Sequence, residues 1–237
     1  MNEKSMQIIT SYRDAHPHIT PLISDWPAHE DAGYDAFQAT KELANILEAT
    51  DQAIPFRYKH ADATEEKVRL WIDELVLASS PARVSGVPKV GTGSSLLLLG
   101  PTGTGKTFQG YGALRRLSVL GVNASPEASP IADIYAKMRP RPGVDSEEVF
   151  ESYAHAPLLF VDDLGAAKES EWVEEVTTRL VNYRYDRALP TIFTSNVPPR
   201  ELGDKIGERV ASRLIEMCRT VVLKGQDRRR GAQGVAA

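Results

Sequence analysis

From Ser94 onward, short apolar runs alternate with segments of helical periodicity. An apolar run of about five residues between turn residues is typical of a buried strand. Strands that alternate with helices favour a parallel sheet covered by helices. We expect strands at 94–99, 122–131, 157–161, 191–195 and 219–223, the second being weakened by Pro126 and Pro130. We expect helices at 107–121, 132–138, 170–187 and 207–217, and one more that Asp145 and Glu148 cap.

The first 93 residues have a different pattern. Residues 1–30 lack clear periodicity and contain three prolines, so we expect a loose arm there. Residues 31–50 have a helical pattern, and a second helix is predicted after Asp62, which would cap it together with Glu65. Pro, Gly and Ser residues mark 81–93 as a linker. The predicted units are a helical region at 1–80, the linker at 81–93, an α/β core at 94–226 and a basic tail at 227–237.

Composition limits the class of protein. A chain of 237 residues has room for one α/β domain and a small appendage. The single cysteine, Cys218, excludes an internal disulfide framework and suits a reducing cytoplasm. No apolar run approaches 18 residues, and the polar, acidic N-terminus is unlike a signal peptide. We therefore expect a cytoplasmic protein without a membrane span.

Charge is spread unevenly around a net value of −4. Residues 1–50 contain three Lys or Arg and eight Asp or Glu, whereas residues 200–230 contain nine and five. Two solvated surfaces would explain this distribution. The alternative is an acidic arm for a protein partner and a basic edge for phosphates or nucleic acid.

A glycine-rich loop follows the first expected strand and opens the next helix. Its residues are Gly100, Pro101, Thr102, Gly103, Thr104, Gly105, Lys106 and Thr107. A strand, such a loop and a helix in this order are typical of a P-loop, which binds nucleotide phosphates through backbone N–H groups and the helix N-terminus. Lys106 would contact the β- and γ-phosphates and the Thr107 hydroxyl would hold Mg²⁺, so ATP and Mg²⁺ are the expected ligands.

Polar side chains end the next two central strands. Asp162 and Asp163 follow an apolar run in the Walker B arrangement. Ligands of an open parallel sheet lie at the carboxyl ends of its strands, so Asp162 would hold Mg²⁺ and Asp163 would polarise the attacking water. An Asp pair in a simple turn is the alternative. Asn196 ends the following strand, where its amide would orient water or contact the γ-phosphate, although Asn is also common in proline-flanked turns.

Two arginines lie four residues apart on the last expected helix. Arg209 and Arg213 therefore share one helix face. A solvated basic face, paired with Glu208 and Glu216, is one explanation. An arginine aimed at a γ-phosphate is the other, and such a residue contributes on the order of 10³–10⁵ in rate.

Together these motifs resemble AAA+ ATPases of the DnaC/IstB group, which are helicase loaders and transposition ATPases. The resemblance covers about residues 54–230. It rests on the P-loop, Leu-Leu-Phe-Val-Asp-Asp-Leu-Gly at 158–165, Thr-Ser-Asn at 194–196 and Gly-Glu-Arg-Val-Ala-Ser-Arg-Leu at 207–214. It implies an α/β fold in which a three-layer AAA+ P-loop domain has a central five-stranded parallel sheet and a small helical N-terminal region. It also implies no helical lid domain, because the chain stops soon after the fifth strand.

The resemblance also implies roles for single residues. Asn196 matches the sensor-1 residue, Arg213 the arginine finger with Arg209 as its helper, and Arg229 the sensor-2 arginine. The neighbouring arginines at 228 and 230 leave this last match open. Nucleotide contacts are further expected from Arg57, Tyr58 and Phe108. A helix that grips single-stranded DNA in this group would fall near residues 131–138, with phosphate contacts from Lys137, Arg139 and Arg141.

The function that the resemblance implies is an ATP-hydrolysing loader, which places a DnaB-type hexameric replicative helicase on single-stranded DNA. The finger would act across a subunit boundary, so ATP would favour a ring or spiral of subunits, and the N-terminal helices would dock the helicase. A transposition helper ATPase of the same group shares every core motif and remains the alternative. The Thr-Ser-Asn and arginine motifs argue against a nucleotide or small-molecule kinase. No helix-turn-helix follows the core, which argues against a duplex-binding initiator.

Overall fold

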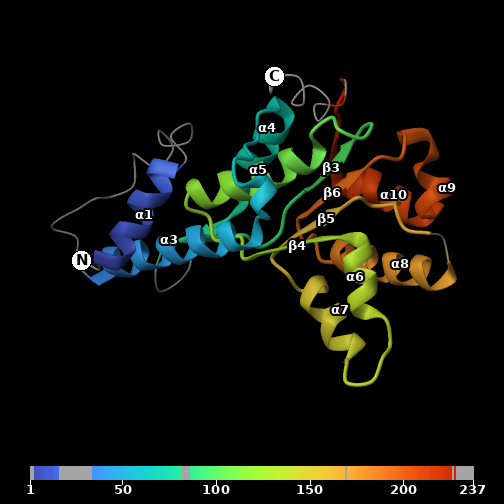
Figure 1. Ribbon diagram of the computed structural model, residues 1–237, viewed down its shortest axis with the longest axis horizontal. Coiled ribbons are helices and arrows are strands. Elements are labelled where there is room, and N and C mark those ends of the chain that lie inside the picture. Colours follow the sequence, from blue (N-terminus) through green and yellow to red (C-terminus); the bar gives the residue numbers. More distant parts are fainter. Residues whose placement is uncertain (1–2, 16–33, 82–85, 169, 226, 228–237) are drawn as a thin grey trace, which may run out of the picture.

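A five-stranded parallel sheet organises the computed structural model (Figure 1). The structure describes residues 3–15, 34–81, 86–168, 170–225 and 227. In spatial order the strands are β4 (Pro126–Pro130), β5 (Leu158–Asp162), β6 (Thr191–Ser195), β3 (Ser95–Leu99) and β7 (Cys218–Val222). Every neighbouring pair of these strands is parallel. The α/β class with a central five-stranded parallel sheet is confirmed.

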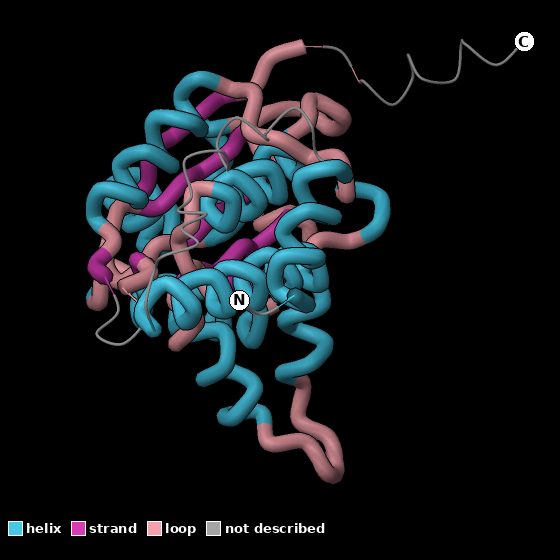
Figure 2. Tube along the Cα trace, turned by 90° about the vertical axis from the view of Figure 1, so that its left-hand side faces the viewer, coloured by secondary structure: helices cyan, strands magenta, loops and turns pink. Residues whose placement is uncertain are grey.

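Helices cover both faces of this sheet (Figure 2). One face packs against α4 (Glu66–Ala78) and α5 (Lys106–Val119). The other packs against α6 (Ile131–Met138), α7 (Ser146–Ala154), α8 (Glu171–Asp186), α9 (Leu202–Ile206) and α10 (Glu208–Met217). The described residues also include two short 3₁₀ turns, η1 (Phe56–Tyr58) and η2 (Pro199–Glu201), which bury none of their side chains.

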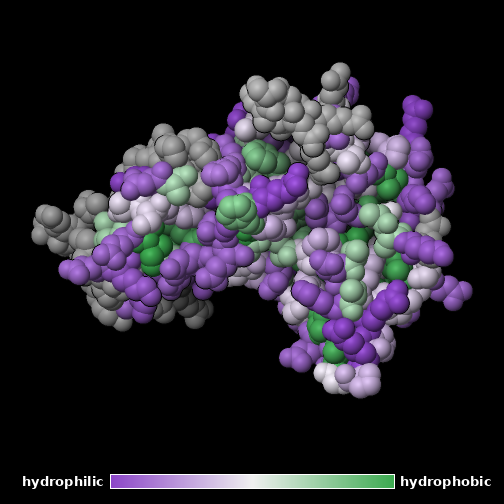
Figure 3. Space-filling view, viewed as in Figure 1, coloured by the Kyte–Doolittle hydropathy of each residue, from purple (hydrophilic) through white to green (hydrophobic). Residues whose placement is uncertain are grey.

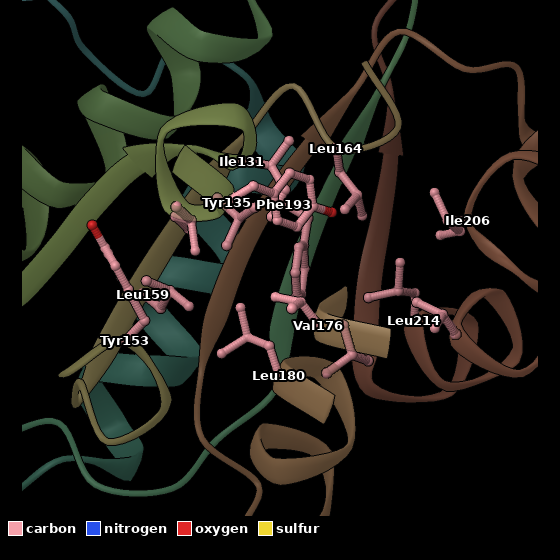
Figure 4. Packing of buried hydrophobic residues seen from close by; sticks show 14 of the residues in the cluster. Ile131, Tyr135, Tyr153, Leu159, Leu164, Val176, Leu180, Phe193, Ile206 and Leu214 are labelled. Atoms are coloured by element: carbon pink, nitrogen blue, oxygen red, sulfur yellow. The ribbon is translucent and has the colours of Figure 1, made fainter. Parts of the chain in front are cut away.

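The central strands are buried on both faces, which explains their continuous apolar runs. On β3, Leu96 and Leu98 join the core beneath α4 and α5, whereas Leu97 and Leu99 join the opposite core. In that second core, side chains of α6, α8 and α10 surround Phe193 of β6 (Figure 4). Covering both faces leaves the carboxyl ends of the strands as the edge from which side chains can reach a ligand.

The N-terminal helices pack beside the far end of α5. They are α1 (Glu3–Ala15) and α3 (Tyr34–Ala53), and together with α5 they enclose a small apolar cluster of Ile9, Tyr12, Leu43, Ala44, Leu47 and Val119. The expected loose arm at 1–30 is therefore wrong for residues 3–15. The buried positions of α1 are Ser5, Ile9 and Tyr12, a stripe too short and too polar to stand out in the sequence. The rest of the expected arm, 16–33, lies outside the described residues.

Two further local expectations differ from the structure. The expected linker at 81–93 includes β2 (Pro88–Lys89), which pairs antiparallel with β1 (Ser80–Pro81). Asp62 does not cap α4, because that helix begins at Glu66 and makes no side-chain cap hydrogen bond. Asp62 instead forms an ion pair with Arg116 of α5 at 3.4 Å. The expected cap at Asp145 is confirmed, since its carboxylate accepts from the N–H groups of Glu147 and Glu148.

Among the residues that the structure describes, no helix combines the length and the apolar character needed to cross a membrane.

Candidate nucleotide-binding site

A cavity of about 430 Å³ opens at the carboxyl ends of the central strands. It is lined by Arg57, Tyr58, Thr102, Gly103, Gly105, Lys106, Thr107, Phe108, Asp163 and Asn196. The structure thus brings the glycine-rich loop, Asp163, Asn196 and the expected adenine-side residues to one place. A cavity of this size is in the usual range for a small-molecule ligand.

Lys106 is held inside the P-loop. Its side chain is buried, and its Nζ donates to the carbonyl oxygens of Gly100 at 2.7 Å and Pro101 at 2.8 Å. The third contact is to Oδ1 of Asn196 at 2.7 Å. Because an ammonium has three N–H donors, each donor has an oxygen acceptor in this arrangement.

Gly103 lies where the P-loop meets the end of the core. Its φ of +83° belongs to the left-handed region that glycine adopts without strain. A Cβ atom at this position would lie 1.9 Å from Oδ1 of Asp227, so no other residue fits while Asp227 stays there. The chain after β7 therefore passes over the P-loop, and the Leu223 N–H donates to the carbonyl of Leu99 at 2.7 Å.

Thr107, the residue after Lys106, is hydrogen-bonded to Asp162 at the end of β5. The Thr107 hydroxyl donates to Oδ1 and Oδ2 of Asp162 at 2.9 and 3.2 Å. Burial raises the pKa of Asp162, while hydrogen bonds from Thr194 and Thr107 oppose that rise. A hydroxyl and a carboxylate are the oxygen ligands that Mg²⁺ takes from a protein when phosphates and water supply the rest. This pair therefore fits the expected magnesium site.

Asp163 points to the next strand. Its Oδ1 accepts from Nδ2 of Asn196 at 2.8 Å, so Asn196 links Asp163 to Lys106. The φ of Asp163 is +57°, which is uncommon for a residue other than glycine. Consecutive side chains of a strand point to opposite faces. The turn at Asp163 interrupts this alternation directly after β5.

Thr194 is the site residue that the sequence indicated only as part of the Thr-Ser-Asn motif. Its hydroxyl donates to Oδ1 of Asp162 at 2.5 Å and accepts from the N–H of Asp163 at 2.9 Å. Its own carbonyl accepts from the N–H of Leu164 at 2.8 Å. The sequence contained a signal, because a buried polar residue at the end of a central strand needs a partner.

The short turn η1 supplies part of the cavity wall, since its residues Arg57 and Tyr58 line the cavity. Tyr58 stacks on Tyr111 of α5 with ring centroids 5.0 Å apart. Gln109 of α5 also binds two residues that come after Tyr58 in the sequence, Thr64 and Glu65. Gln109 donates to Thr64 at 2.7 Å and accepts from the N–H of Glu65 at 3.0 Å. These contacts fix the segment that carries Arg57 and Tyr58 against the helix that begins at the P-loop.

The two candidate finger arginines lie outside this cavity, on α10. The Arg213 guanidinium lies 5.4 Å from the ring centroid of Tyr185, and its Nη1 donates to the carbonyl of Arg209 at 3.3 Å. Neither arginine lines the cavity that contains Lys106. The expected sensor-2 residue, Arg229, lies outside the described residues.

The expected DNA contacts cluster on one projection. The loop between α6 and α7 extends away from the sheet in the ribbon view and in the tube view (Figure 1 and Figure 2). Lys137 donates to the Tyr153 hydroxyl at 2.9 Å, a bond that raises the pKa of this lysine, and Arg139 lies 5.6 Å from the Trp172 ring. Lys137, Arg139 and Arg141 are all exposed, and hydrophilic side chains cover much of this end (Figure 3).

A parallel sheet with a glycine-rich loop at the carboxyl end of a central strand is typical of nucleotide-binding α/β domains, and solved structures share this fold. The crystal structure of the DnaC helicase loader aligns with a TM-score of 0.58 at 23% identity, covering 72% of this chain and 100% of that chain. The structure of DnaI aligns with a TM-score of 0.61 at 20% identity, covering 76% and 98%. AMPPCP-bound DnaA from Aquifex aeolicus aligns with a TM-score of 0.52 at 21% identity, over 67% of this chain and 45% of that one.

Two curated proteins named replicative helicase loaders are similar to this chain in sequence. The replicative helicase loader DnaC of Escherichia coli K12 is 24% identical over 192 residues, which is 80% of this chain and 78% of that protein. The replicative helicase loader DnaI of Bacillus subtilis strain 168 is 29% identical over 160 residues, which is 60% of this chain and 49% of that protein. No protein-family model matches the chain. The resemblance to DnaC-type AAA+ proteins is thereby confirmed.

Proposed function

We propose that this chain is an ATP-hydrolysing loader of a replicative DNA helicase onto single-stranded DNA. The observation that carries the proposal is the joining of the P-loop, Asp163 and Asn196 in one cavity, in a chain whose curated relatives are named helicase loaders. The cavity supports nucleotide chemistry, and the relatives support the choice of partner.

The hydrolytic site would use residues of three neighbouring strands. Lys106 and the P-loop backbone would bind the phosphates, and Thr107 and Asp162 would hold Mg²⁺, which neutralises charge on the transferred phosphoryl group. Asp163 would orient and polarise the attacking water, because its carboxylate lies in the cavity beside the amide of Asn196. Tyr58 and Phe108 would flank the base.

The arginines of α10 would serve a neighbouring subunit. Arg209 is exposed and Arg213 is half-buried on α10, and neither of them lines the cavity of their own chain. A finger supplied from a second subunit would complete the site only in an assembly, so ATP would stabilise a ring or spiral. ATP acts as a switch in this way because it binds the assembled state better than the dispersed one.

Single-stranded DNA would bind along the projection formed by α6, α7 and their loop. Three cations are exposed there, and Trp172 and Tyr153 lie beside two of them. Basic groups that follow a backbone, together with aromatic rings, are the usual chemistry of single-strand binding. The helices α1 and α3 would dock the helicase.

The test combines hydrolysis with partner capture. The full chain is tagged, held with Mg²⁺ and a non-hydrolysable ATP analogue, and mixed with the purified hexameric helicase and, separately, with a transposase from the same genome. Nucleotide-dependent retention of the helicase, together with ATP hydrolysis by the chain, supports the loader. Retention of the transposase alone would instead establish the transposition helper, and absence of hydrolysis would refute an ATPase.

A further inference from the structure

Thr194 joins both Walker B residues through one hydroxyl. Its side chain is fully buried, at 0% exposure, at the carboxyl end of β6. A hydroxyl has one proton to donate and lone pairs to accept. Thr194 uses the proton for Oδ1 of Asp162 and a lone pair for the N–H of Asp163. A buried group satisfied in both directions fixes its two partners relative to one another.

The backbone carbonyl of Thr194 adds a third hydrogen bond to the same stretch of chain. It accepts from the N–H of Leu164, so a single residue of β6 binds Asp162, the last residue of β5, and the two residues that follow it. The middle position is Asp163, with its left-handed φ. Such a conformation costs energy in a residue other than glycine and persists where neighbouring contacts hold it. These bonds therefore maintain the turn that brings both carboxylates to the site.

We propose that Thr194 is a positioning residue for nucleotide-bound Mg²⁺, which acts by orienting the Asp162 carboxylate and the backbone at Asp163. The proposal rests on the function proposed above, because it assigns Thr194 to the same site. In the structure, Thr107 and Thr194 both donate to Asp162. If the Thr107 hydroxyl held Mg²⁺, Thr194 would remain as the hydroxyl that orients this carboxylate. Groups that orient a metal ligand in this way change metal affinity or activity about 10- to 100-fold when they are removed.

The same strand offers a matched control. Thr191 is as fully buried as Thr194, but its hydroxyl accepts from Nε of Arg184 at 2.6 Å and lies at the opposite end of β6. Thr191→Val removes a buried hydroxyl from the same strand without touching the Walker B residues. A purely structural role for Thr194 would make the two valine variants behave alike.

The experiment measures the Mg²⁺ concentration that half-saturates binding of a fluorescent, non-hydrolysable ATP analogue to the full chain. Thr194→Val should raise this concentration about 10- to 100-fold, and Thr194→Ser should restore it. Thr191→Val should lower the melting temperature but leave the Mg²⁺ requirement unchanged. Thr194→Cys, with its weaker donor, gives a smaller shift in the same direction and replaces the valine variant if that variant does not fold.

Two results would overturn the proposal. One is a Thr194→Val protein that folds and keeps the wild-type Mg²⁺ requirement. The other is an equal shift in Thr191→Val. A wild-type chain that binds the analogue with Mg²⁺ but hydrolyses no ATP would refute the ATPase function, and the Mg²⁺ titration would still decide on Thr194.

Discussion

At the scale of residues, the site is a set of hydrogen bonds that ties three strands together. Asn196 joins Lys106 to Asp163, and Thr194 joins Asp163 to Asp162. Thr107, which follows Lys106 in the sequence, donates to Asp162 and so closes the network. A substitution of any residue in this network should therefore affect the P-loop, Asp162 and Asp163.

Asp163→Asn tests the water-activating role at this scale. The amide keeps the shape of the side chain but is a far weaker base, so turnover should fall about 10²- to 10⁴-fold. Nucleotide affinity should stay near the wild-type value, because Lys106 and the P-loop are unchanged. Steady-state hydrolysis and titration of an ATP analogue give the two quantities, and undiminished turnover would exclude Asp163 as the base.

The sequence predicted most of these residues because their signals are local. A P-loop and a carboxylate that ends an apolar run are visible within a few positions. The sequence indicated that Thr194 needs a partner, but which residues it binds was not predictable, because that depends on β6 lying beside β5. Tyr111, which stacks on Tyr58, was missed for the same reason: nothing near it in the sequence predicts its partner.

At the scale of elements, α5 connects the P-loop to the residues before α4 and to the helices α1 and α3. One stripe of α5 binds the residues before α4, through Gln109 and Arg116. On another side of the helix, the fully buried Arg115, next to Arg116 in the sequence, donates to the Tyr12 hydroxyl of α1 at 3.1 Å and lies 3.9 Å from Asp51 of α3. The helix that opens at Lys106 is thus also the support for the region proposed to dock the helicase.

Gly112→Ala tests the close approach on this stripe. A Cβ atom there would lie 2.2 Å from the backbone carbon of Asp62, so the segment must shift. Alanine favours a helix by about 1 kcal/mol over glycine, but overpacking costs about 1–3 kcal/mol, so the free energy of unfolding should fall. Gly91→Ala is the control, because nothing lies within 4 Å of its added Cβ. A more stable Gly112→Ala protein in denaturant titration would contradict the packing.

Tyr12→Phe tests the attachment of α1. The ring remains beside the Arg115 guanidinium, but a buried N–H donor loses its acceptor, at a cost of about 1–3 kcal/mol. Amides of α1 should exchange with solvent faster, while those of β3 and β5 keep their protection. Tyr185→Phe removes a hydroxyl on α8 and should leave α1 unchanged. Equal protection of α1 in both variants would argue against the anchor.

Elements with continuous apolar runs were predicted well, and those that depend on tertiary contacts were not. The strand Thr191–Ser195 matches its expected bounds, and α8 (Glu171–Asp186) is within one residue of them. Asp62 has the sequence spacing of a helix cap, but in the structure it forms an ion pair with Arg116 of α5 instead. The helix α1 was missed because it buries only Ser5, Ile9 and Tyr12.

At the scale of the whole molecule, the two α10 arginines lie apart from the nucleotide cavity, and this is why we propose that subunits assemble to complete the site. Lys106 lies in the cavity, whereas Arg209 and Arg213 lie on α10 outside it. The α/β class followed from the alternation of strands and helices. The spatial strand order did not, because an apolar run does not specify its neighbours.

Mixing two inactive variants tests the shared site. Lys106→Ala should bind nucleotide at least about 10-fold more weakly, since charge-assisted contacts to phosphate are lost. Arg213→Ala should bind ATP normally but lose on the order of 10³–10⁵ in turnover. Mixed together, they should regain hydrolysis at interfaces where an intact P-loop meets an intact Arg213. Normal turnover by Arg213→Ala alone, or no recovery on mixing, would contradict a finger that acts between subunits.

The most direct measurement of the central claim is helicase loading onto closed circular single-stranded DNA. The cognate replicative helicase is mixed with a circle that is coated with single-strand-binding protein and carries one annealed oligonucleotide, and release of the oligonucleotide is followed. The loader account predicts rapid release with ATP and the wild-type chain, and little release with Lys106→Ala or without the chain. Equal release in all three reactions would contradict it.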